Sequence, residues 1–155
     1  MTPGHQLAHD IKGTGPLLVA VHGITENRGF WDPVRLHQHF RVPRVDLRGH
    51  GESPRISPFG IDASVEDIHR LIESLSEDLT GDQSPPVVGH SLGGVIATAY
   101  AARYPTPGVV TIDQSLRVGP LPTRMCSAAF GPRCSIPHLA EPEWFVSRVR
   151  EFFGG

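Results

Sequence analysis

The stretch Val87-Val88-Gly89-His90-Ser91-Leu92-Gly93-Gly94 decides the fold, because it joins an apolar strand to a helix through a very short turn. Gly89 and Gly93 flank Ser91 in the spacing Gly-x-Ser-x-Gly, which is typical of a sharp strand-to-helix turn. In so tight a turn, a Cβ atom at either glycine would collide with the neighbouring strand or helix. The stretch therefore predicts a serine at a helix N-terminus, where the helix dipole and free N–H groups favour developing negative charge.

A serine in this position needs two further kinds of group before it can act as a nucleophile. Its hydroxyl attacks a carbonyl when a base, commonly a histidine oriented by a carboxylate, takes its proton. The oxyanion that forms needs two N–H donors, each worth on the order of 3 kcal/mol. The Leu92 N–H, directly after the serine, is one candidate donor. The other is the Ile24 N–H in His22-Gly23-Ile24, where we expect His22 to hold the loop in a structural role.

Apolar runs and amphipathic segments alternate along the chain up to Asp113. Residues 17–21 form a continuous apolar run, which suits a strand buried on both faces of a sheet. In residues 62–79, apolar side chains recur at intervals of three and four, which indicates a helix with one buried stripe. Strands are expected at 7–12, 17–21, 41–47, 85–88 and 108–113, and helices at 31–40 (entered through Asp32 and Pro33), 62–79, 94–104 and 142–153.

This alternation predicts an α/β fold, with a mostly parallel sheet and helices on both faces. In such sheets, ligands bind outside the carboxyl ends of the strands. His22, the segment 48–50, Ser91 and Asp113 each come directly after an expected strand. We therefore expect these residues to converge on one edge of the sheet.

Several motifs together resemble the α/β-hydrolase superfamily, in its broad group of esterases, lipases and related Ser-His-Asp hydrolases. The stretches that carry the resemblance are Val-Ala-Val-His-Gly at 19–23, Asp-Leu-Arg-Gly-His-Gly-Glu-Ser at 46–53, Gly-His-Ser-Leu-Gly-Gly at 89–94, and Ile-Pro-His-Leu with Pro-Glu-Trp-Phe within 136–145. The resemblance implies that Ser91 is the nucleophile, that Ile24 and Leu92 form the oxyanion hole, and that the fold is a partly complete α/β-hydrolase fold. Residues 1–120 would be the N-terminal part of the hydrolase domain, 121–141 a Pro-rich irregular segment, and 142–155 a C-terminal helix packed on the same domain.

The chain departs from the family pattern after Asp113. In the family, the triad follows the order serine, acid, histidine along the chain. The strands that normally carry the acid and the histidine, and the cap between them and the first half, are not recognisable here, and Ser135 stands where the histidine is expected. Asp113, at the end of a strand, is a candidate acid whose alternative role is a turn residue. His138 is a candidate substitute base whose alternative role is a surface or packing histidine.

The remaining features exclude other classes of partner and cofactor. The formal net charge of −2, with both signs interspersed, gives no basic face for nucleic acid. The chain has no apolar run of membrane-spanning length and does not start like a signal peptide, so we expect no membrane partner and a cytoplasmic location. His37 and His39 lie two apart on one expected helix and make a poor metal pair, and no His-Glu-x-x-His or Cys-x-x-Cys motif is present. The serine-hydrolase mechanism that the resemblance implies needs no metal or organic cofactor. We expect His90 to point into the scaffold and His50 to be structural.

Two functions follow from these expectations. The first is a serine hydrolase that cleaves small carboxylic esters through a Ser91 acyl-enzyme. The second is a catalytically impaired or inactive shortened relative, which binds a ligand or a partner and self-associates through an exposed sheet edge. A nucleotide-binding α/β domain is disfavoured, because no phosphate-binding Gly-rich loop is present.

Overall fold

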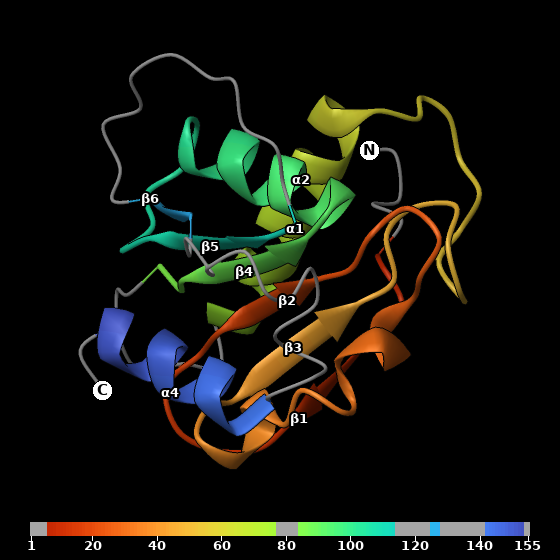
Figure 1. Ribbon diagram of the computed structural model, residues 1–155. Helices are drawn as coiled ribbons and strands as arrows, with labels where there is room; N and C mark the ends of the chain where they lie inside the picture. Colours follow the sequence, from red (N-terminus) through yellow and green to blue (C-terminus); the bar gives the residue numbers. More distant parts are fainter. Residues whose placement is uncertain (1–5, 77–83, 114–124, 128–141, 154–155) are drawn as a thin grey trace.

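A computed structural model describes residues 6–76, 84–113, 125–127 and 142–153 and shows one mixed sheet between two helical layers (Figure 1). The six strands lie in the order β1-β3-β2-β4-β5-β6. Their bounds are β1 His9–Lys12, β2 Val19–Val21, β3 Val42–Val45, β4 Val87–His90, β5 Val109–Ile112 and β6 Met125–Ser127. Strand β1 pairs antiparallel with β3, and all other neighbours pair parallel. The predicted α/β class with a mostly parallel sheet is confirmed.

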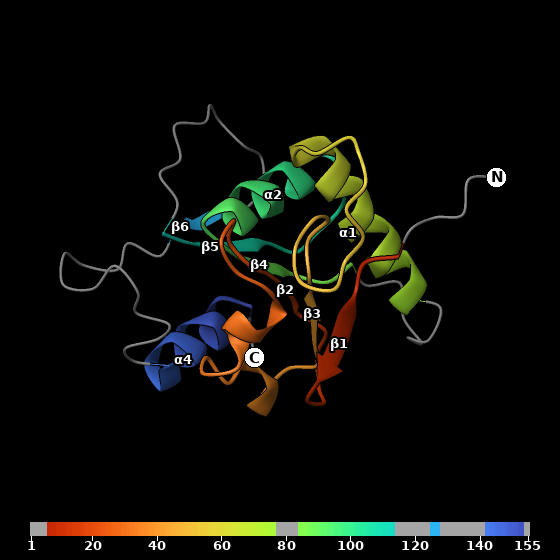
Figure 2. The same cartoon turned by 90° about the vertical axis from the view of Figure 1, so that its right-hand side faces the viewer.

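Two helical layers cover the two faces of this sheet, as Figure 2 shows edge-on. Helices α1 (Ile61–Ser76) and α2 (Leu92–Ala101) lie on one face. Helix α4 (Pro142–Phe152) and two short 3₁₀ helices, η1 (Arg28–Trp31) and η2 (Leu36–Gln38), lie on the other.

Alternate residues of the central strands fill two separate cores. Val19 and Val21 of β2 pack with the apolar stripe of α1, whereas Leu18 and Ala20 pack with Trp31 and the buried side of α4. Successive side chains of a strand point to opposite faces, so a strand covered on both sides must be apolar throughout. The continuous apolar run at residues 17–21 thus places β2 in the middle of the sheet.

The prediction of a helix at residues 31–40 is wrong. The chain forms η1 and η2 there, and Arg35 between them takes a left-handed conformation with φ 59°. Asp32, expected to cap the helix, instead accepts hydrogen bonds from Lys12 and Arg44, both at 2.6 Å. Because side chains from β1 and β3 hold the Asp32 carboxylate, it does not cap a helix N-terminus, and Asp32 instead stands at the C-terminal end of η1. Asn27 caps η1 by accepting a hydrogen bond from the Gly29 N–H.

Strand β6 lies inside the segment that the sequence predicted to be irregular. Residues Met125–Ser127 pair parallel with Val109, Val110 and Thr111 of β5. A three-residue strand in a Pro-rich segment carries no periodicity of its own, so the partner strand decides its conformation. The sheet therefore continues one strand beyond β5, which we had expected to be its last.

The other elements match the expectations to within a few residues. Helix α1 begins at Ile61, with the Ser64 hydroxyl donating to the Gly60 carbonyl at 2.9 Å. Helix α4 spans almost the whole range predicted for it. Among the described residues, no helix combines the length and the apolar character that crossing a membrane requires.

Candidate active site

Ser91 stands between β4 and α2 in a backbone conformation that side chains rarely adopt. Its φ and ψ are 50° and −114°. Its N–H donates to the Ile112 carbonyl at the end of β5 (2.9 Å), and its carbonyl accepts from the Gly94 N–H (2.9 Å). These bonds anchor the residue to the neighbouring strand and to the first turn of α2. A non-glycine residue held in such a conformation is typical of a functional site, where the surroundings must maintain it.

Gly89 and Gly93 make this conformation possible through close backbone contact. A Cβ atom at Gly89 would lie 2.1 Å from the Gly93 carbonyl oxygen, and one at Gly93 would lie 2.2 Å from the Val21 carbonyl oxygen. Both obstacles are backbone atoms, which cannot rotate away. The turn therefore brings α2 into direct contact with both β4 and β2.

The Leu92 N–H lies at the start of helix α2 and is the first candidate donor to the oxyanion. It belongs to the first turn of the helix, where N–H groups have no intrahelical acceptor. Ile24, the second candidate donor, lies on the loop after β2 with its side chain 64% exposed. Ile24 and Leu92 line the same cavity, so the structure brings the two candidates together.

Two side chains, Glu26 and His50, brace the loop that carries Ile24. The Glu26 carboxylate accepts from the Gly23 N–H at 2.7 Å, and the same oxygen accepts from His90 Nδ1 at 3.0 Å. His50 Nε2 donates to the Ile24 carbonyl at 2.7 Å. The Gly23 N–H and the Ile24 carbonyl, on either side of the Ile24 N–H, are thus fixed by hydrogen bonds, one within the loop and one from the loop after β3.

His22 lies fully buried beneath the loop after β2. Its Nδ1 donates to the Gly23 carbonyl at 2.6 Å, and its Nε2 accepts from the Leu47 N–H at 3.0 Å. These partners require a neutral ring with the proton on Nδ1. Burial lowers the pKa of His22, which keeps the ring in that neutral form. His22 thus ties the loop after β2 to the loop after β3.

The His90 side chain contacts the loop after β2 and the helix η1. Besides its bond to Glu26, its ring stacks on Phe30 of η1, with 4.6 Å between ring centroids. The residue directly before the serine therefore joins the end of β4 to the helical layer around η1.

Asp113 lies alongside Ser91, as the strand order implies. It follows Ile112, the residue whose carbonyl holds the Ser91 N–H, and its own φ is 52°. Its side chain is exposed, and no described histidine is bonded to it. His138, the candidate substitute base, lies outside the described residues. Within the described part of the chain, no histidine is hydrogen-bonded to the Ser91 hydroxyl.

A cavity of about 360 Å³ opens beside the two candidate oxyanion donors. The loop after β3, the start of α1 and the first turns of α2 form its walls. Its lining residues are Ile24, Leu47, Arg48, His50, Phe59, Gly60, Ile61, Ser64, Leu92 and Ile96. Ser91 itself is not among these residues, but Leu92, which follows it in the chain, is.

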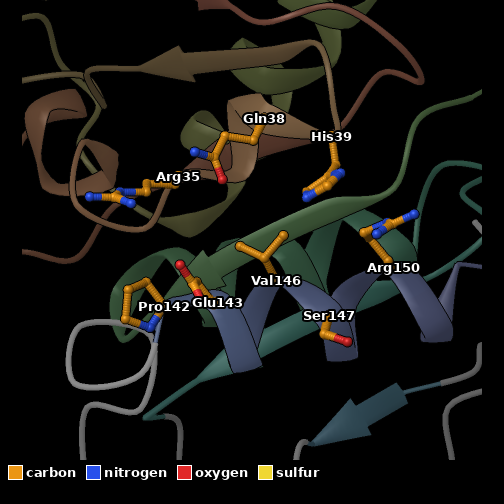
Figure 3. Close-up of a pocket in the computed structure, with 8 residues that line it drawn as sticks. All are labelled: Arg35, Gln38, His39, Pro142, Glu143, Val146, Ser147 and Arg150. Atoms are coloured by element: carbon orange, nitrogen blue, oxygen red, sulfur yellow. The ribbon is translucent and has the colours of Figure 1, made fainter.

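A second cavity of about 240 Å³ lies on the other face of the sheet, between η2 and α4. Figure 3 shows Gln38 and His39 opposite Glu143, Val146 and Arg150 across it. None of the candidate catalytic or oxyanion residues lines this cavity. It is therefore a separate feature of the molecule.

The sequence analysis missed Glu26 and Phe59. Glu26 follows Gly23 by three residues, and its N–H donates to the Gly23 carbonyl at 3.2 Å, which closes a tight turn. The short spacing between Gly23 and Glu26 is the feature of the sequence that could have indicated this contact. Phe59 lies in a Pro- and Gly-rich loop without periodicity, where no pattern indicates which side chain faces a cavity.

Comparisons with known proteins agree with this arrangement. A family model described as alpha/beta hydrolase fold matches residues 16–154. The 2-(acetamidomethylene)succinate hydrolase of Mesorhizobium japonicum is 39% identical over 108 residues, which are 66% of this chain and 37% of that protein. The pimeloyl-[acyl-carrier protein] methyl ester esterase of Pseudoalteromonas atlantica is 38% identical over 96 residues, 61% of this chain and 34% of that protein.

Solved structures give the same result. A thermophilic esterase from Thermogutta terrifontis superimposes with a TM-score of 0.64 at 35% identity, covering 73% of this chain and 42% of that one. The chain thus spans about a third of the length of the curated relatives that it matches.

Proposed function

The chain belongs to the alpha/beta hydrolase family, and from that premise we propose that it carries the nucleophile and oxyanion hole of a serine hydrolase acting on small carboxylic esters. The observation that carries this proposal is the conformation of Ser91, with φ 50° at the junction of β4 and α2. The relatives' names include a methyl ester esterase, which supports the ester as substrate class.

The reaction that fits this geometry is acyl transfer in two steps. The Ser91 Oγ attacks the ester carbonyl carbon as a base takes its proton, and the carbonyl π electrons move onto the oxygen. The Ile24 and Leu92 N–H groups stabilise that oxyanion. Collapse of the intermediate breaks the bond to the alkoxy group, which takes the proton and leaves as an alcohol. Water then attacks the Ser91 ester in the same way and releases the carboxylic acid.

The base and the acid of this proposal are His138 and Asp113. Asp113 is supported by its place one residue after the strand end that holds Ser91. His138 is supported by the resemblance of its surroundings to those of the family histidine. His22, His50 and His90 are less suitable, because each is hydrogen-bonded to groups away from Ser91.

These bonds favour the alternative that this chain is catalytically impaired. A triad enzyme that lacks its histidine retains only the rate that binding and the oxyanion hole supply. In that case the pocket would serve for binding alone.

A fluorophosphonate probe separates the two functions, because it reacts only with an activated serine. We expect labelling of the wild-type chain that disappears in Ser91→Ala. Loss of labelling in His138→Ala as well, but not in His37→Ala, would identify the base. If the wild-type chain remains unlabelled, the alternative holds.

A further inference from the structure

One face of helix α4 lines the cavity of about 240 Å³ that separates this helix from η2. The residues of this face recur at intervals of three and four, and they are Glu143, Val146, Ser147 and Arg150. Val146 is buried, whereas the other three are exposed. The helix therefore presents a carboxylate toward one end of the cavity and a guanidinium toward the other.

The opposite wall of this cavity comes from η2 and the residues beside it. Arg35, Gln38 and His39 line the cavity there, and Figure 3 shows Gln38 and His39 extending toward α4. Leu36 and Phe40, which flank this segment, are buried in the same core as the apolar side of α4. The Phe40 N–H donates to the Leu36 carbonyl at 3.0 Å, which holds the backbone between them. Both walls are therefore anchored by buried side chains.

Two arginines of this cavity, Arg35 and Arg150, pair with no carboxylate of the described residues. Most other arginines in the described ranges do have such a partner, and they are Arg28, Arg44, Arg48, Arg70, Arg103 and Arg148. The contrast is clearest within α4, where Arg148 pairs with Glu151 at 2.8 Å and Arg150 faces the cavity instead. The His39 ring is likewise hydrogen-bonded to no described group. The cavity thus collects N–H donors that the described protein groups leave unused.

The donors of this cavity match an oxyanion, such as the phosphate or carboxylate group of a small ligand. A guanidinium presents its N–H groups in a planar fork that fits two oxygen atoms of either group. The His39 ring carries at least one N–H donor in either protonation state. Glu143 lies seven residues before Arg150, about 10 Å along the helix axis. Salt screens most of the repulsion between exposed charges over that distance, so Glu143 does not prevent an anion from binding at Arg150.

We propose that the cavity between η2 and α4 is a binding site for a small oxyanion, held between His39 and Arg150. Figure 3 shows these two side chains toward the same end of the cavity, with Arg35 and Glu143 toward the other. The volume of about 240 Å³ is below the range of about 300–1,000 Å³ for drug-sized ligands, so it suits an ion or the anionic group of a small molecule. No candidate catalytic or oxyanion residue lines the cavity, so this site is independent of the proposed function.

Titration of the wild-type chain with inorganic phosphate tests this site, followed by NMR with chloride at equal ionic strength as the reference. We expect saturable shifts of the backbone amides at 35–39 and 146–150. Arg150→Gln should weaken phosphate binding about tenfold, the scale of a hydrogen bond to a charged group, and His39→Gln should weaken it several-fold. Arg55→Gln is the matched control, because it removes an exposed arginine outside the cavity, and it should change nothing. All three side chains are exposed, so the variants should keep the circular dichroism of the wild type.

Acetate, titrated in the same way, distinguishes the two sources of the oxyanion. Tighter binding of phosphate assigns a phosphorylated ligand, and tighter binding of acetate assigns a carboxylate ligand. The inference is overturned if neither anion gives saturable shifts at the cavity, or if Arg150→Gln and Arg55→Gln weaken binding equally. Ser91→Ala should bind phosphate as the wild type does. A chain that no fluorophosphonate labels would therefore refute the proposed nucleophile and leave this test unaffected.

Discussion

Replacing Gly93 by alanine should destabilise the chain and displace the candidate nucleophile together. The new Cβ atom would lie 2.2 Å from the Val21 carbonyl oxygen and 2.6 Å from the His22 carbonyl oxygen. Ordinary contacts begin at 3.4 Å, so the first turn of α2 must move away from β2 by about 1 Å. Overpacking of this kind costs about 1–3 kcal/mol. We therefore expect Gly93→Ala to lower the free energy of unfolding in urea by that amount.

Gly29→Ala is the matched control. A Cβ atom there meets only side-chain atoms, the Asn27 Oδ1 at 3.0 Å and the Asp32 Oδ2 at 3.7 Å. The Asn27 Oδ1 has to give by only a few tenths of an ångström, which at most weakens its cap on η1, so the unfolding free energy should fall by no more than about 1 kcal/mol. Equal unfolding midpoints for the two variants would refute the claim that α2 touches the β2 backbone at Gly93.

The same displacement should reduce the reactivity of Ser91. A shift of about 1 Å in a reacting group costs on the order of 100-fold in rate. Fluorophosphonate labelling of folded Gly93→Ala, measured under conditions where it retains its native circular dichroism, should be slower by that factor. A labelling rate within threefold of wild type would mean that the position of α2 does not control the nucleophile.

Three further predictions concern the groups that hold the site and its scaffold. Arg48→Met leaves the Asp67 carboxylate buried without its partner and should cost about 3–5 kcal/mol in urea unfolding, part of which a second change, Asp67→Leu, should recover. Burial lowers the pKa of His22. At a pH below the ordinary histidine value of 6.5, the unfolded chain therefore binds a proton at His22 that the folded chain does not bind. The unfolding free energy should therefore fall as the pH drops below that value, by at most about 1.4 kcal/mol per pH unit, and His22→Gln should flatten this dependence. Phe145→Ala empties a fully buried position and should cost about 3–5 kcal/mol, whereas Trp144→Ala, on the exposed side of α4, should cost less than about 1 kcal/mol, both measured by urea unfolding.

Local sterics made the central part of the fold predictable from sequence. The Gly-x-Ser-x-Gly spacing specifies a turn in which Gly89 and Gly93 meet backbone atoms, and this turn fixes β4, α2 and the position of Ser91. The continuous apolar run of β2 specifies a strand covered on both faces. Both signals lie within a few residues of the structure that they determine, so no knowledge of distant partners is needed.

The errors arise where distant groups decide the local conformation. Asp32 could have capped a helix, but Lys12 and Arg44 hold its carboxylate. Strand β6 has no pattern of its own and forms against β5. Such tertiary effects override local propensity and are not visible in a short stretch of sequence.

The hydrogen bonds that hold the candidate oxyanion loop were likewise not predictable from a short stretch of sequence. His50 bonds to the Ile24 carbonyl from the loop after β3, and Glu26, within the loop itself, is held in turn by His90, so the motif predicts the loop but not what holds it. The sequence indicated that the strand ends bearing Ser91, Asp113 and the loop of His22 meet at one edge. It also predicted structural roles for His22, His50 and His90, but not the groups to which each is bonded.

The most direct test of the central claim is whether Ser91 forms an acyl-enzyme. The wild-type chain is incubated with p-nitrophenyl acetate, quenched in acid, digested and analysed by mass spectrometry. We expect an acetyl group on the peptide that contains Ser91, located on the serine by fragmentation and absent from Ser91→Ala. An unmodified Ser91 peptide, or acetylation that persists at the same level elsewhere in Ser91→Ala, would contradict it.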